Sequence, residues 1–89
     1  MTETEFRARA AELGYGNFRT REFEPNLNSE LHTHEFAVFG LVTRGSLRLG
    51  FEDGREDSHS EGDCCELAAE TLHAERTGSD GATFLLATK

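Results

Sequence analysis

The chain has 89 residues, enough for one small domain with a marginal hydrophobic core. Its 17 acidic and 9 basic residues give a formal net charge of −8, which disfavours nucleic acid and anionic membrane surfaces as partners. No apolar run is long enough to span a bilayer, and the acidic start "MTETEF" lacks the pattern of a signal peptide. A core this small would gain stability from a bound ion or a partner subunit.

Residues 2–13 are predicted to form a helix. Thr2 or Thr4 can cap its N-terminus by accepting hydrogen bonds from free backbone N–H groups. Apolar residues recur at helical spacing along one face: Phe6, Ala10 and Leu13. We expect the leading segment, residues 1–14, to pack as a helix across the outside of a single domain formed by residues 15–89.

The remainder of the chain alternates in a strand-like manner and is broken by glycine, aspartate and serine. The predicted strands are Phe18–Glu24, Leu31–Phe39, Gly40–Thr43, Ser46–Glu52, Asp63–Leu67, Leu72–Thr77 and Ala82–Thr88. Hairpin turns are predicted at "EDGRED" (52–57), which contains Asp-Gly, and at "TGSDGA" (77–82). Short strands at this spacing indicate an all-β fold, either an antiparallel sandwich or a small barrel.

The two cysteines, Cys64 and Cys65, are adjacent. Neighbouring residues rarely bridge each other, and this is not the spacing of a zinc knuckle. We therefore expect two reduced thiols on a strand, which suits a cytoplasmic location.

Three of the four histidines stand out as candidate metal ligands. The stretch "LHTHEF" places His32 and His34 two residues apart, and on a strand such side chains face the same way. The alternative is a pair of imidazoles on a solvent-facing strand. His73, at the start of a later predicted strand, is the candidate third ligand, and its alternative is an ordinary histidine near a loop. His59 lies among polar residues, so a surface role is expected for it.

This pattern resembles the first motif of the cupin superfamily, G-x5-H-x-H-x(3,4)-E-x6-G. His32 and His34 fill the histidine positions, and Gly45 fills the last glycine. Asn26 stands at the first glycine and Val38 at the glutamate. The glutamate ligand typical of the family is therefore absent from its usual position.

A second stretch, "GDCCELAAETLH", resembles the family's second motif, G-x5-P-x-G-x2-H-x3-N. Gly62 and His73 fill the glycine and histidine at its ends. Ala68, Glu70 and Thr77 replace the proline, the second glycine and the asparagine. The continuation "HAERTG" is similar to that of small bacterial single-domain cupins with a short leading helix.

The resemblance implies a small all-β jelly-roll barrel with a short N-terminal α-helix and a divalent metal ion in its mouth. His32, His34 and His73 would be the metal ligands. Without a carboxylate the site would disfavour hard ions such as manganese and leave zinc, iron(II), nickel or copper. The implied partners are a small-molecule ligand or substrate and a second copy of the chain, paired through strand edges as a homodimer.

Glu75 is the candidate catalytic residue. It lies two residues beyond His73 and faces the same side if the strand continues. It can ligate the metal, hydrogen-bond a ligand or accept a proton. The alternative is a salt bridge with Arg76 or Arg44. Glu66 is a weaker candidate that is expected to point outward.

The predicted barrel interior is apolar and small, so a small substrate is expected. The residues expected to line it are Phe36, Val38, Leu47, Leu49, Leu67 and Phe84. Two functions remain open. One is a metal-dependent enzyme of dioxygenase, isomerase or lyase type, for which only Glu75 is placed to move protons. The other is a non-catalytic module or sensor that binds a metal or small ligand.

Overall fold

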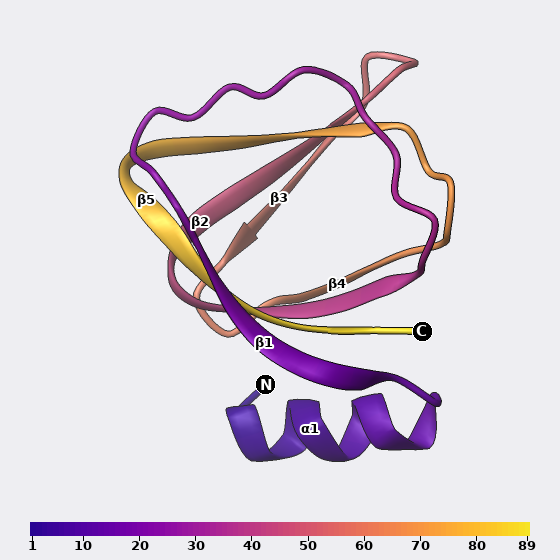
Figure 1. Cartoon of the computed structure of the whole chain (residues 1–89). Coiled ribbons are helices and arrows are strands. Elements are labelled where there is room, and N and C mark those ends of the chain that lie inside the picture. The colour runs from indigo at the N-terminus through magenta and orange to yellow at the C-terminus, as the bar shows by residue number, and fades with distance from the viewer.

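The computed structural model describes all residues, 1–89, and consists of one helix and a strongly bent antiparallel sheet (Figure 1). The elements are α1 (Glu3–Glu12), β1 (Gly16–Phe23), β2 (Val38–Phe51), β3 (Glu56–Ser60), β4 (Cys64–Leu67) and β5 (His73–Thr88). The strand order is β1-β5-β2-β3, and β4 pairs with the first part of β2. The predicted small jelly-roll barrel with a short N-terminal helix is confirmed. No helix is long and apolar enough to cross a membrane.

Two long strands form most of the barrel. β2 and β5 have 14 and 16 residues, although the residues of β2 were divided among three predicted strands and those of β5 between two. The predicted hairpin at "TGSDGA" is wrong. The register passes from Gly45↔Ala82 to Leu47↔Thr77, so residues 78–81 bulge out of β5 without reversing the chain. A bulge bends a strand and increases its twist, which lets β5 continue around the barrel wall.

Two other segments differ from the prediction. Residues 31–36 do not form a strand, and a single bridge between His32 and His73 ties this part of the chain to β5. β3 (Glu56–Ser60) was not predicted, because its sequence "EDSHS" has no apolar alternation. It pairs with β2 through backbone hydrogen bonds, and the Asp53-Gly54 turn joins the two strands as predicted.

Alternating side chains of β2 and β5 build two hydrophobic clusters. The outer cluster lies between the sheet and α1 and contains Phe6, Ala10, Tyr15, Phe39, Leu41, Leu85 and Ala87. The inner cluster fills the barrel and contains Phe23, Val42, Leu47, Leu49, Ala82, Phe84 and Leu86. In Figure 1, α1 lies outside the barrel below β1, as predicted. A capping box between Thr2 and Glu5 begins this helix.

The glycine positions of the two cupin-like motifs share a left-handed backbone. Gly45 and Gly62 have φ angles of 74° and 91°. Asn26 and Glu70, which replace glycines of the motifs, also have positive φ angles of 57° and 62°. The turn conformation is therefore retained where the glycine is lost. Gly45 has a second constraint, because a Cβ atom there would lie 2.1 Å from the carbonyl oxygen of Gly81.

We predict that Gly45→Ala destabilises the chain more than Gly54→Ala does. Gly54 also has a positive φ of 89°, but nothing lies within 4 Å of a Cβ built there. Gly54→Ala should therefore cost only the left-handed strain, about 1–2 kcal/mol. Gly45→Ala adds a backbone collision to that cost. Urea unfolding of both variants checks this, and equal losses would contradict the close approach of residues 45 and 81.

Candidate metal centre

Four candidate ligands meet inside the barrel from two distant parts of the chain. His32 and His34 come from the loop between β1 and β2, and His73 and Glu75 from the start of β5. One ligand atom from each residue lies within 4.8 Å of all the others. Two donors around a tetrahedral zinc ion lie about 3.4 Å apart, so side-chain movements of about 1 Å would bring all four onto one ion. The structure thus brings together the three predicted histidines and Glu75.

The backbone that presents His32 and His34 is irregular, yet both rings still face His73. The His32 N–H donates to the His73 carbonyl at 2.8 Å, and the His73 N–H returns a bond of 3.0 Å. The ring centroids are 5.1 Å apart for His32 and His34, 4.6 Å for His32 and His73, and 5.3 Å for His34 and His73. Strand alternation therefore predicted correctly that the His32 and His34 rings lie together, although the backbone there is not a strand.

Two of the imidazoles are held in the tautomer that suits a metal ligand. His32 Nδ1 lies 2.8 Å from the Glu30 carbonyl oxygen, and His73 Nδ1 lies 2.7 Å from that of Thr71. A carbonyl only accepts hydrogen bonds, so each Nδ1 carries the proton. The Nε2 atoms are then free to bind an ion, and their orientation is fixed through the other side of the ring.

The Glu75 carboxylate sits directly against these nitrogens. The Glu75 side chain is almost completely buried, and its Oε2 lies 3.0 Å from Nε2 of His32 and 3.7 Å from that of His73. With Nδ1 of His32 protonated, two lone pairs would face each other across the shorter distance. The gap therefore requires a cation, either a shared proton or a metal ion. This donor set and its geometry fit a divalent metal.

Neither salt bridge considered for Glu75 is present. Arg76 pairs with Glu56 at 2.9 Å, and Arg44 donates to the Asp80 carbonyl oxygen at 2.9 Å. The nearest arginine to Glu75 is Arg21, with Nη1 4.0 Å from Oε1. Glu75 is thus oriented toward the histidines and not toward the outer surface of β5.

His34 differs from the other two histidines in its surroundings. Burial lowers the pKa of His34, and the neighbouring His73 and His32 lower it further. Its ring stacks on Phe36, with the centroids 5.2 Å apart. A lowered pKa favours the neutral imidazole, which is the form that binds metals.

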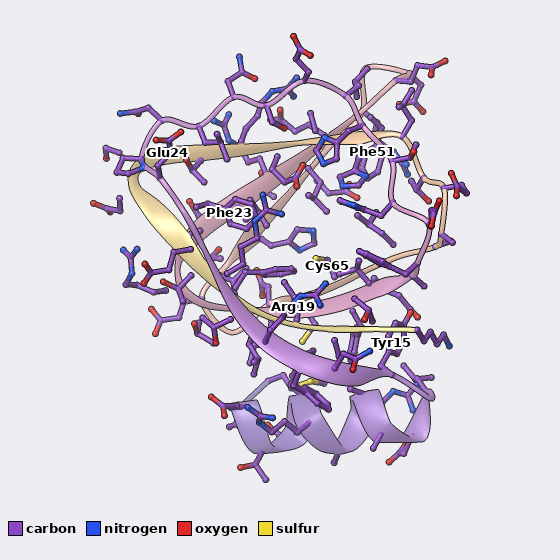
Figure 2. All side chains as sticks on the ribbon, viewed as in Figure 1. Tyr15, Arg19, Phe23, Glu24, Phe51 and Cys65 are labelled. Atoms are coloured by element: carbon purple, nitrogen blue, oxygen red, sulfur yellow. The ribbon has the colours of Figure 1, made fainter.

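A cavity of about 90 Å³ adjoins three of the four candidate ligands, His34, His73 and Glu75. All six residues predicted to line the barrel interior line this cavity, together with Phe23, Cys65 and Leu86. In Figure 2 the labelled side chains of Arg19, Phe23 and Cys65 lie within the outline of the barrel. The cavity is far smaller than a drug-sized pocket, so it suits a ligand of few heavy atoms.

Arg19 and Arg21 also line the cavity, and the sequence analysis missed them. The sequence did contain a pattern that could have identified them. Arg19, Arg21 and Phe23 follow one another at intervals of two residues on a predicted strand, and Phe23 is buried in the barrel. Strand alternation places all three on the same face.

The remaining candidates lie away from the centre. Glu66 is exposed and accepts a hydrogen bond of 2.6 Å from the Tyr15 hydroxyl, so it points outward as expected. Burial and the bond to Glu66 raise the pKa of Tyr15 to about 12.

His59 is half-buried on β3, contrary to its expected surface position, because it shares a face with Leu47. Its Nε2 is buried without a hydrogen-bond partner, and the residue is not part of the cluster.

The cysteines do not contribute a ligand to the cluster. Both are free thiols on β4, as predicted. Burial raises the pKa of Cys65 to about 12, and this holds the thiol in its protonated, unreactive form inside the cavity wall.

No protein-family model matches the sequence, and no curated protein matches it. Several solved structures are similar in fold. A cupin superfamily protein from Desulfitobacterium hafniense is 15% identical with a TM-score of 0.67, over 80% of this chain and 63% of that one. DMSP lyase DddQ from Ruegeria pomeroyi is 17% identical with a TM-score of 0.72, over 81% and 36%. Oxalate decarboxylase from Lactobacillus farciminis is 25% identical with a TM-score of 0.67, over 81% and 22%.

This chain spans less than two thirds of the length of each of these three proteins. What they share with it is the fold, and the strongly bent antiparallel sheet of this chain agrees with that likeness. The chain is therefore a small protein with the cupin fold.

Proposed function

We propose that the chain binds one divalent transition-metal ion through His32, His34, His73 and Glu75, and that this centre acts on a small molecule in the adjoining cavity. The observation that carries the proposal is the convergence of four ligand atoms within 4.8 Å. The Glu75 carboxylate also lies 3.0 Å from His32 Nε2, which is close enough for one ion to contact both groups.

Glu75 changes the expected choice of metal. A carboxylate partly neutralises the ion and adds an oxygen donor, so manganese joins zinc, iron(II), nickel and copper as a candidate. Four protein ligands leave open positions on an ion that takes six. A metal ion in such a site acts as a Lewis acid toward a substrate oxygen. The apolar cavity wall would exclude bulk water from the same space.

Two of the similar structures are named as a lyase and a decarboxylase, and both names refer to small substrates. Among the dioxygenase, isomerase and lyase types, these names favour a lyase-type reaction for this chain. Glu75 would be the residue that moves a proton in it, provided that it leaves the metal ion during the reaction.

One observation favours a second candidate, a non-catalytic metal-binding or sensor module. Glu75 is the only acidic residue that lines the cavity, and it belongs to the ligand cluster. While it holds the metal, no free carboxylate remains to accept a proton. The two candidates differ in whether turnover accompanies metal binding.

We further propose that the chain is a cytoplasmic homodimer. β1 and β3 form the two ends of the sheet order, and each has one unpaired edge that a second copy would cover. The two free thiols suit a reducing compartment. Light scattering during size-exclusion chromatography tests the assembly, because a monomer of 9.9 kDa would contradict it.

Changing each histidine of the cluster to alanine should abolish stoichiometric metal binding. His32→Ala, His34→Ala and His73→Ala each remove one nitrogen donor from the four. His59→Ala is the matched control, because His59 lies outside the cluster, and it should bind metal as the unchanged chain does. Mass spectrometry of desalted, metal-loaded protein checks this. Full occupancy in the His73→Ala variant would refute the proposed site.

Glu75→Gln should weaken metal binding by about 10–100-fold and leave the fold intact. The amide keeps the shape of the side chain but removes the negative charge that faces the ion. Glu66→Gln is the control, since Glu66 is exposed and bonded to Tyr15 outside the barrel. Competition with a chelating dye measures both affinities. An unchanged affinity in Glu75→Gln would remove Glu75 from the ligand set.

Removing the metal should lower the melting temperature without unfolding the chain. Both hydrophobic clusters are complete without the ligands, so the fold does not depend on the ion. Metal at 100 times its dissociation constant should add about 2.7 kcal/mol. Circular dichroism with and without a chelator checks this. Unfolding at room temperature after chelation would favour the structural-metal module instead.

A further inference from the structure

Two arginines face the cavity beside the metal centre. Arg19 and Arg21 alternate along β1 and line the cavity together with Phe23. The Arg19 guanidinium lies 5.8 Å from the ring centroid of Phe36, and that of Arg21 lies 4.6 Å from the ring centroid of Phe23. Both residues are exposed to solvent, and contact with these aromatic rings positions their guanidinium groups at the mouth of the cavity.

Neither arginine has an adequate anionic partner. Five other arginines are hydrogen-bonded or ion-paired: Arg7, Arg9, Arg44, Arg48 and Arg76. The Arg19 side chain makes no hydrogen bond or ion pair, and that of Arg21 has only Glu75 at 4.0 Å. Arg55 also lacks an ion pair, but it lies away from the cavity, so Arg19 and Arg21 are the unpaired or weakly paired arginines that line it. The only acid that lines the cavity is Glu75, which already faces two histidines.

A bound metal ion would increase the imbalance. Glu75 would direct its charge to the ion, and Arg21 would lose its only anionic neighbour. The mouth of the cavity would then carry two guanidinium groups beside a metal ion, and apart from the histidines and Glu75 the rest of the lining is apolar. An apolar wall strengthens attraction to a charge of opposite sign. The two arginines therefore make the mouth of the cavity locally positive, although the chain as a whole has a net charge of −8.

We propose that Arg19 and Arg21 bind the carboxylate of a small carboxylic acid, whose other end faces the metal centre. This inference rests on the proposed function, because it assigns the ligand of the same site. A guanidinium group presents paired N–H donors that match the two oxygens of a carboxylate. The cavity of about 90 Å³ restricts the ligand to a few heavy atoms.

The test compares pyruvate with pyruvamide, a neutral amide of the same shape, on zinc-loaded protein by NMR titration. The unchanged chain should bind pyruvate about tenfold or more tightly than pyruvamide. Arg19→Gln and Arg21→Gln should each weaken pyruvate binding by about tenfold, because each removes hydrogen bonds to a charged group. Pyruvamide affinity and zinc content should not change. Arg21→Lys, which keeps the charge, should retain part of the preference.

Arg55→Gln is the matched control. Arg55 also lies over an aromatic ring, 4.4 Å from the Phe51 centroid, but it does not line the cavity. This variant should bind pyruvate as the unchanged chain does. Circular dichroism of every variant excludes loss of fold as the cause of weaker binding.

The experiment can refute the metal centre and the anion site independently of each other. The zinc content of the protein tests the metal centre alone. If zinc binds but pyruvate and pyruvamide bind equally, or the Arg19 and Arg21 variants match the unchanged chain, the anion site is refuted and the metal centre stands. If zinc does not bind, the same titration on metal-free protein decides. An arginine-dependent preference for pyruvate would then uphold the anion site, and no preference would refute it.

Discussion

The antiparallel pairing of β2 with β5 is the constraint on which the rest of the structure depends. It runs from Val38↔Thr88 to Phe51↔His73 and is interrupted only at the bulged positions. Because neighbouring residues on each strand face opposite sides, this one ladder supplies both hydrophobic clusters. The same register sets Glu75 opposite Leu49 near the end of β2, where the loop carrying His32 crosses.

The buried Glu75 carboxylate, next to the imidazole nitrogens, is the main charged group of the candidate metal centre. Glu75 is stabilised by what surrounds it: His32, His73 and, at longer range, Arg21. The family's glutamate position is occupied by Val38, whose side chain lines the cavity without a charge. The carboxylate beside the histidines therefore comes from β5 and not from the start of β2.

The same residue separates the two proposed functions. A carboxylate that stays on the metal ion cannot also accept a proton from a substrate. An enzyme would therefore need Glu75 to move, or would use chemistry that needs no protein base. Arg19 and Arg21, beside Glu75, concern which ligand the cavity binds. They do not decide whether the bound ligand is turned over. Anion binding is compatible with either function.

The sequence by itself determined the features that depend on local spacing. Strand alternation predicted the cavity-lining set from Phe36 to Phe84, and the N-terminal sequence limited the helix cap to Thr2 or Thr4. The resemblance of the two motifs to those of cupins grouped the three histidines. Only the tertiary structure decided what depends on pairing between distant segments. The bulge at residues 78–81, the polar strand β3 and the contact of Glu75 with His32 result from strand register. Local patterns do not specify register, because it is set by which residues lie opposite one another across the sheet.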